Sequence, residues 1–155
     1  EYLSSEQFLT LAFPERAEQP KALWLDADIK QQLSDILTHD YSGLRVRYWQ
    51  SGLRTAWVFN EIGKELPITI GVVVDQHQVA KVEILAFRES RGGEVRYPFF
   101  RDQFQGVSLA EDHRLSKHID GLSGATLSVR AVTRVTRVAL YLHQLAMAEQ
   151  AVPPL

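Results

Sequence analysis

The segment Asp120-Gly121-Leu122-Ser123-Gly124-Ala125-Thr126 places a threonine hydroxyl at the end of a run of mostly small residues. After Thr126, apolar residues recur every three or four positions from Leu127 to Leu145, which predicts a helix that begins at or near Thr126. A helix N-terminus offers unpaired backbone N–H groups and the positive end of the helix dipole, so it favours a phosphate joined to that hydroxyl. The small neighbours leave the hydroxyl uncrowded for a modifying enzyme. The segment therefore predicts a covalent attachment site at Thr126.

The same residues permit a second interpretation, because small residues before a helix are also ordinary turn and capping residues. In that interpretation Thr126 belongs only to a capped helix start. Ser123 and Ser128 are competing hydroxyls, and we expect both to cap or flank the helix start. Asp120 is equally consistent with an ordinary turn residue and with a group that orients the acceptor loop.

The segment resembles the flavinylation motif of the FMN-binding domain family, Asp-Gly-x-Ser/Thr-Gly/Ser-Ala-Thr, and matches it at every position. The resemblance implies that Thr126 carries FMN through a phosphoester and that a separate FAD:protein FMN transferase makes this bond with a metal ion. Asp120 then recognises the transferase or orients the acceptor loop. No catalytic residue is implied within the chain. The other motif residues implied at the cofactor site are Gly121, Ser123, Gly124 and Ala125.

A second stretch is similar to the same family, whose members place a glutamate loop after a strand and then a segment that ends in Phe-x-Gly. Glu89 keeps the glutamate and Phe104-Gln105-Gly106 fits the later pattern, whereas Ser90 and Arg91 stand where threonine and proline are usual. The resemblance extends over about Leu44 to Ala146 and implies that Glu89 and Ser90 line the flavin pocket. Without the resemblance, the segment is an ordinary solvated loop.

The residues of this loop have definite uses beside a flavin. Gly92 and Gly93 allow the backbone to approach the ring, and Ser90 offers a hydrogen bond. Arg91 favours the reduced, anionic flavin if it faces the ring, and has no effect if it is an exposed loop arginine. The aromatic residues that follow are expected mainly to fill the core, with at most one or two against the flavin: Tyr97, Phe99, Phe100 and Phe104.

Hydrophobic periodicity predicts an α+β fold in which an antiparallel β-meander packs with N-terminal helices and a C-terminal amphipathic helix. Short links between strands favour a meander over a doubly wound sheet, which needs crossover helices. Four strands are expected over about 44–49, 54–62, 68–74 and 79–88. Two helices are expected to precede them, one from Ser4 or Ser5 to Phe13 and one from Asp26 or Asp28 to before Ser42, with a connector at 15–21 between them.

The chain has 155 residues, of which 45% are hydrophobic and 23% charged, which is enough for one globular unit. We divide it into an N-terminal helical segment, 1–43, and an FMN-binding domain, 44–150. A net charge of -2 without a basic face argues against a nucleic-acid partner. The lack of cysteine excludes disulfides, thiolate metal sites, iron–sulfur clusters and c-type haem.

The histidines suggest no metal site, and the arginines of the last predicted helix argue against a membrane span. The five histidines form no close ligand pair, and arginines interrupt the most apolar helix. We expect the solvent face of that helix to carry Arg130, Arg134 and Arg137. Four basic residues before the motif form either a local positive potential for a phosphate or a solvated basic loop: His113, Arg114, Lys117 and His118.

Three functions follow from these observations. The first is a covalent FMN electron carrier that exchanges electrons with a membrane or soluble redox partner, and this is favoured over a stand-alone enzyme. The others are a cofactor-free binding module of the same fold and a flavin-dependent reductase with its own substrate. The resemblance implies a periplasmic or extracytoplasmic location, with any membrane association made through a partner or an anchor before Glu1. Since the sequence opens at Glu1 without a methionine or an apolar leader, we expect either a processed mature chain or a trimmed one.

Overall fold

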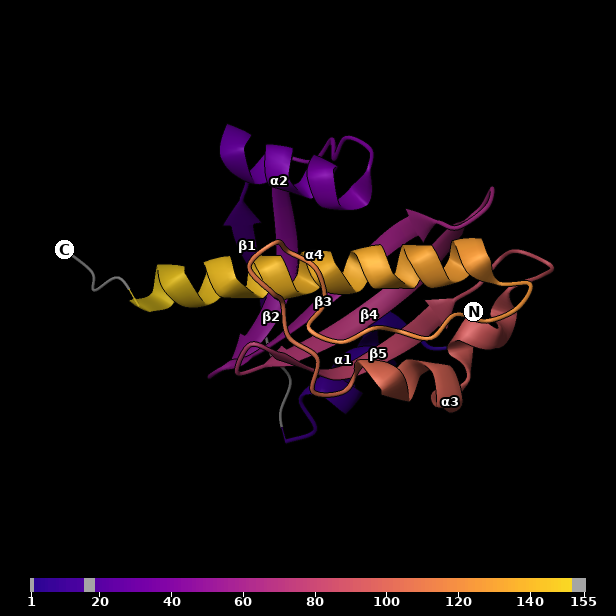
Figure 1. Ribbon diagram of the computed structural model, residues 1–155. Coiled ribbons are helices and arrows are strands. Elements are labelled where there is room, and N and C mark those ends of the chain that lie inside the picture. The colour runs from indigo at the N-terminus through magenta and orange to yellow at the C-terminus, as the bar shows by residue number, and fades with distance from the viewer. Residues whose placement is uncertain (1, 16–18, 152–155) are drawn as a thin grey trace.

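Five strands form one antiparallel sheet in the order β1-β2-β3-β4-β5 in the computed structural model (Figure 1). The structure describes residues 2–15 and 19–151. Because neighbours in the sheet are also neighbours along the chain, the sheet is a meander, and the α+β fold predicted from the sequence is confirmed. The strands are β1 (Pro20–Trp24), β2 (Arg45–Ser51), β3 (Arg54–Ile62), β4 (Pro67–Asp75) and β5 (Gln78–Ala86).

The strand β1 corrects the expectation that two helices precede the sheet. It lies between α1 (Ser5–Ala12) and α2 (Ala27–Leu37) and pairs with β2 along its whole length. No alternation marks this strand in the sequence, because Leu23 is the only buried residue of β1. Pro20 was assigned to a connector, but proline is tolerated as the first residue of an edge strand. Residues 16–18 of that connector lie outside the described residues.

Capping groups determine where the first two helices begin. The Ser4 hydroxyl accepts the Gln7 N–H at 3.0 Å while Gln7 Oε1 accepts the Ser4 N–H at 2.8 Å, which is a reciprocal capping box at the start of α1. The Asp26 carboxylate accepts the Ile29 N–H at 2.9 Å at the start of α2. Both helices therefore begin where the sequence predicted.

Helices cover both faces of the sheet: α4 (Thr126–Ala151) lies across one face and α1 lies against the other (Figure 1). In β4, Val72 packs in the core with α4, whereas Val73 packs with α1. A Cβ on Gly71 would lie 2.6 Å from the ring of Phe8. Glycine at this position therefore lets α1 approach the sheet closely.

Short helical segments follow the sheet: η1 (Gly93–Arg96), α3 (Pro98–Arg101) and η2 (Asp102–Phe104). Phe100 and Phe104 are fully buried, and their rings meet edge to face at 5.5 Å, as expected for core aromatics. Tyr97 and Phe99 are exposed. The loop 105–125 then crosses over α4 before it reaches the start of that helix (Figure 1).

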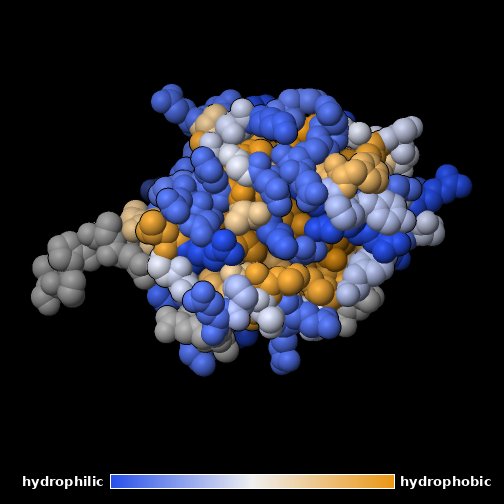
Figure 2. Space-filling model, turned by 90° about the horizontal axis from the view of Figure 1, so that it is seen from below, coloured by the Kyte–Doolittle hydropathy of each residue, from blue (hydrophilic) through white to orange (hydrophobic). Residues whose placement is uncertain are grey.

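The surface mixes apolar and hydrophilic side chains. Figure 2 shows the molecule from below, where apolar patches alternate with hydrophilic side chains. Within 2–15 and 19–151, no helix combines the length and the apolar character needed to cross a membrane.

Candidate functional site

Thr126 is the first residue of α4, and its side chain is exposed. The preceding turn is closed by a hydrogen bond from the Ala125 N–H to the Leu122 carbonyl at 3.0 Å, and Gly124 adopts a φ of 80° within it. The Val129 N–H donates to the Ala125 carbonyl at 2.9 Å, which is a helical bond of the first turn. The N–H groups of residues 126–128 therefore belong to the part of the helix that has no preceding turn to accept from them.

A pocket of about 310 Å³ surrounds this threonine, and a second of about 180 Å³ adjoins it. Three segments meet there: the β3–β4 loop, the loop after β5 and the first turn of α4. The two pockets share Lys64, Arg91 and Ser128. Residues of the first pocket alone are Gly92, Gly124, Ala125, Thr126 and Leu127, and those of the second alone are Glu89 and Ser90. The fold therefore brings Thr126 close to both loop residues predicted to line a cofactor pocket.

Glu89 joins the loop after β5 to the β3–β4 loop. Its Oε1 accepts hydrogen bonds from the backbone N–H groups of Glu65, at 2.7 Å, and of Leu66. A carboxylate that accepts two backbone N–H groups is held firmly, because these are charge-assisted bonds. Glu89 thus positions the β3–β4 loop that carries Lys64.

Glycine allows the loops to lie against the first turn of α4. A Cβ on Gly92 would lie 2.6 Å from the Ser128 hydroxyl oxygen, which is too close for any residue other than glycine unless Ser128 moves. Gly92 also has a φ of 90°, a conformation that favours glycine. Ser128 itself is buried, in agreement with the expectation that it flanks the helix start.

Asp120 lies in the loop that leads to the pocket and does not line it. Its backbone is held by the Gln103 amide, which accepts the Asp120 N–H at 2.8 Å and donates to the Asp120 carbonyl at 3.2 Å. Its carboxylate is 87% exposed and lies 3.7 Å from His118 Nε2. Gly121 and Ser123 are likewise exposed and do not line the pocket.

Lys64 and Gln103 are the two residues of this region that the sequence did not single out. Lys64 stands in Gly63-Lys64-Glu65, which reads only as a loop after a strand. Gln103 stands in an aromatic segment, where a single glutamine gives no signal of its partner. Lys64 and Gln103 each lie beside a segment that is distant in the sequence, so no local sequence pattern identifies them.

The expectation that three arginines form the solvent face of α4 is wrong for two of them. Arg134 donates from Nε to the buried Glu61 carboxylate at 3.0 Å, and Arg137 donates from Nε to the His113 carbonyl at 2.6 Å. Arg130 is exposed. The reason is that β3 and the loop 105–125 lie on either side of this helix and present acceptors to it.

Glu61 also has a second partner, His39. His39 Nε2 lies 2.9 Å from the Glu61 carboxylate and His39 Nδ1 lies 3.0 Å from the Asp40 carbonyl, so both ring nitrogens have acceptors. The Asp40 carbonyl, followed by Glu61, raises the pKa of His39 above its usual 6.5. This cluster joins α4 to the end of β3.

A buried histidine lies near the other end of α4. His143 Nε2 accepts the His77 backbone N–H at 3.2 Å, so Nδ1 carries the proton and donates to Thr55 Oγ1 at 2.7 Å. Trp57 Nε1 donates to the same oxygen at 2.7 Å. Burial lowers the pKa of His143 to about 4. Among residues 2–15 and 19–151, no group of three or more His, Asp or Glu side chains is arranged to hold a metal ion.

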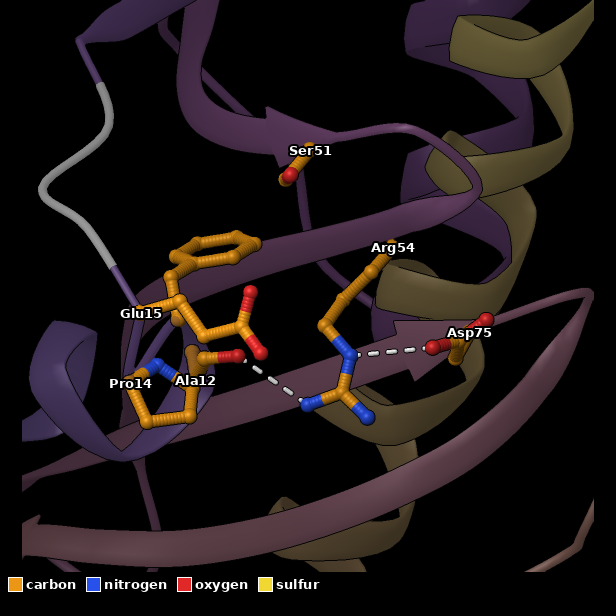
Figure 3. A pocket seen from close by; sticks show the side chains of 7 residues that line it. Ala12, Pro14, Glu15, Ser51, Arg54 and Asp75 are labelled. Atoms are coloured by element: carbon orange, nitrogen blue, oxygen red, sulfur yellow. Dashed lines mark hydrogen bonds and ion pairs between the residues drawn. The ribbon is translucent and has the colours of Figure 1, made fainter.

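A larger hollow of about 600 Å³ lies between α1 and the β2–β3 hairpin (Figure 3). Arg54 crosses it, donating from Nε to Asp75 at 2.9 Å and from Nη1 to the Ala12 carbonyl at 3.0 Å. These bonds tie α1 to the sheet. None of the predicted site residues lines this hollow.

Comparison with known families agrees with the geometry around Thr126. The model of the FMN-binding domain family matches residues 63–141, just over half of the chain. The matched range begins in the loop that carries Lys64 and includes the Glu89 loop and the start of α4. A comparison with curated proteins found no match. Because this match covers more than half of the chain, the chain belongs to the FMN-binding domain family.

Proposed function

We propose that the chain is an electron-transfer flavoprotein that carries FMN covalently, through a phosphoester bond to Oγ1 of Thr126. The observation that carries this proposal is the exposed Thr126 hydroxyl at the first turn of a 26-residue helix, inside a pocket that also contains Lys64 and Arg91. The family match supports FMN as the ligand.

The residues of the pocket fit the phosphate of FMN. A phosphodiester keeps one negative charge, and the free N–H groups of the first helical turn, together with the helix dipole, stabilise such a charge. Lys64 and Arg91 add two cations from the facing loops. Thr126 is exposed, so the approach to its hydroxyl is open.

The attachment is a phosphoryl transfer in which a separate enzyme supplies the catalytic base and the metal ion. Thr126 Oγ1 loses its proton and forms a bond to the FMN phosphorus of FAD, and AMP leaves with the electrons of the broken pyrophosphate bond. The chain itself contributes an accessible hydroxyl on a fixed turn. The exposed Asp120 carboxylate is free to contact the transferase.

The remaining residues of the site hold the cofactor in place. FMN supplies one- and two-electron transfer when it is bound. Glu89 fixes the loop that carries Lys64, the exposed Ser90 hydroxyl is available as a hydrogen-bond donor, and the two cations favour negative charge in the pocket. The same proposal includes a redox partner, membrane-bound or soluble, and an extracytoplasmic location, in line with the family members that the acceptor segment resembles.

Mass spectrometry of the intact protein tests the attachment. Coexpression with an FAD:protein FMN transferase is expected to add one FMN moiety to the native chain and to leave the Thr126→Ala variant unmodified. Ser42→Ala is the matched control, because it removes an exposed hydroxyl outside the motif and leaves Thr126 intact. An unmodified native chain, or an FMN adduct that survives Thr126→Ala, contradicts the proposal.

A further inference from the structure

A third pocket, of about 390 Å³, lies where the loop 105–125 crosses α4. It is lined by Arg114, Leu115, Lys117, His118, Ile119, Thr133 and Arg137. Four of these seven side chains are basic, and none is acidic. The sequence left open whether the basic residues of this loop create a positive potential or are simply solvated. The structure adds Arg137 from α4 to the same pocket.

The positive charges of this pocket have few partners within the protein. Lys117 makes no hydrogen bond or ion pair with any residue in the described ranges 2–15 and 19–151. Arg114 lies 3.7 Å from Asp112, and His118 lies 3.7 Å from Asp120, in pairs that are more than half exposed. Exposed pairs of this length contribute little to stability, so these cations remain available to an external anion.

A hydrogen bond holds the Arg137 side chain at this pocket. Its Nε donates to the His113 carbonyl at 2.6 Å, which fixes the guanidinium and leaves its terminal N–H groups without a partner among the described residues. Burial, followed by the nearby positive charge of Arg114, lowers the pKa of Arg137. The two arginines therefore repel each other, and a bound anion would relieve that repulsion.

The lining favours a soluble anion over a membrane surface. The large apolar side chains that are exposed elsewhere on the protein do not include Leu115 or Ile119, which pack against the core. Guanidinium and ammonium groups arranged together suit the tetrahedral oxygens of a phosphate. We infer that this pocket binds a soluble phosphate compound carrying two or more negative charges, such as the pyrophosphate part of a nucleotide.

This pocket is separate from the proposed flavin site. It shares no lining residue with the pockets around Thr126 and Glu89. Thr133 lies seven positions after Thr126 on α4, which corresponds to about 10 Å along the helix. The inference therefore stands without flavinylation.

Calorimetric titration of the full chain with inorganic pyrophosphate tests the inference. We expect saturable binding that Arg114→Gln and Lys117→Gln each weaken by about tenfold, as the loss of one charge-assisted contact implies. Lys117→Gln removes no hydrogen bond or ion pair with the described residues, so we expect this variant to fold as the native chain does. Arg47→Gln, on an exposed position of β2, removes the same charge away from the pocket and is expected to leave the affinity unchanged. The absence of binding at millimolar pyrophosphate, or an equal loss in Arg47→Gln, overturns the inference.

Two further titrations separate this site from its alternatives. The flavinylated chain and the Thr126→Ala variant are expected to bind pyrophosphate as tightly as the unmodified chain. Loss of binding on flavinylation overturns the inference, because the pocket would then belong to the cofactor. Binding to phosphatidylglycerol vesicles without binding to pyrophosphate also overturns it. A chain that accepts no FMN but binds pyrophosphate would contradict only the proposed function.

Discussion

Lys64 and Arg91 reach the pocket of Thr126 from two different loops, and their charges have a measurable consequence for a bound flavin. A nearby cation stabilises the reduced, anionic flavin more than the neutral oxidised form. We therefore expect Lys64→Gln and Arg91→Gln each to lower the midpoint potential of the flavinylated protein. The shift should be tens of millivolts, since about 30 mV corresponds to a tenfold change in equilibrium for a two-electron couple.

Equilibrium titration with redox dyes measures these potentials. Arg47→Gln is again the matched control, because Arg47 is exposed on β2 and does not line the pocket. Unchanged potentials in both pocket variants would show that neither cation acts on the ring.

His143 makes the stability of the protein depend on pH. Burial lowers its pKa to about 4, whereas the unfolded chain titrates near 6.5, so the unfolded state binds more protons between these values. The stabilisation is complete above pH 6.5 and is lost as the pH falls toward 4. The free energy of unfolding is expected to fall by about 3 kcal/mol across this range. Urea unfolding at a series of pH values measures it.

The variant His143→Gln isolates this effect. It has no titratable group at this position, so we expect a lower stability at pH 7 but a flatter profile between pH 4 and 6.5. His39 acts in the opposite direction, because its raised pKa gives a stabilisation that is present below pH 6.5 and is lost as the pH rises through the folded-state pKa. His39 remains in both proteins, so the difference between their profiles belongs to His143. Identical slopes would show that His143 is not the titrating group.

At the scale of elements, three glycines near the start of α4 should respond differently to alanine. Gly92→Ala is expected to cost about 2–3 kcal/mol, because Gly92 has a φ of 90° and its Cβ would lie 2.6 Å from Ser128 Oγ. Gly124→Ala should cost about 1 kcal/mol, since only its φ of 80° is unfavourable. Gly121→Ala should be neutral within about 0.5 kcal/mol.

Chemical denaturation measures all three variants. Gly121 serves as the control, because a Cβ there would meet no atom within 4 Å and its φ lies outside the left-handed region. An equal loss of stability at Gly92 and Gly124 would mean that the contact with Ser128 is unimportant.

Helices and strands with a clear hydrophobic periodicity were predictable from the sequence, whereas β1, which lacks such a periodicity, was not. The strand 54–62 coincides with β3, and α4 begins at Thr126, because the alternation and the helical period are both clear there. β1 was missed because a single buried residue produces no pattern. The partners of Arg134 and Arg137 were missed because they come from β3 and from a loop without periodicity.

At the scale of the whole molecule, the sequence predicted individual residues of the candidate site but not which residues the fold brings together. Thr126 and Glu89 were identified from separate motifs, and the fold places them in adjoining pockets. Lys64 stands between them without a motif of its own, because its position depends on the Glu89 carboxylate that holds its loop. Contacts of this kind depend on the tertiary structure and leave no local signal.

The first 62 residues lie outside the family match, yet they complete the fold. Phe8 of α1 is fully buried against one face of the sheet. On the opposite face, which α4 covers, α2 packs against α4. β1 extends the sheet beyond β2. The N-terminal residues described here are therefore part of the same structural unit as the matched region.

The two hydrogen bonds between Gln103 and the backbone of Asp120 bear on whether folding comes before the proposed modification of Thr126. They join positions 17 residues apart, so they form only when the segment after β5 and the end of the loop 105–125 have come together. The turn that presents Thr126 is thus a product of folding. For the proposed attachment at Thr126, we therefore expect the transferase to modify the folded chain and not newly synthesised chains that are still unfolded.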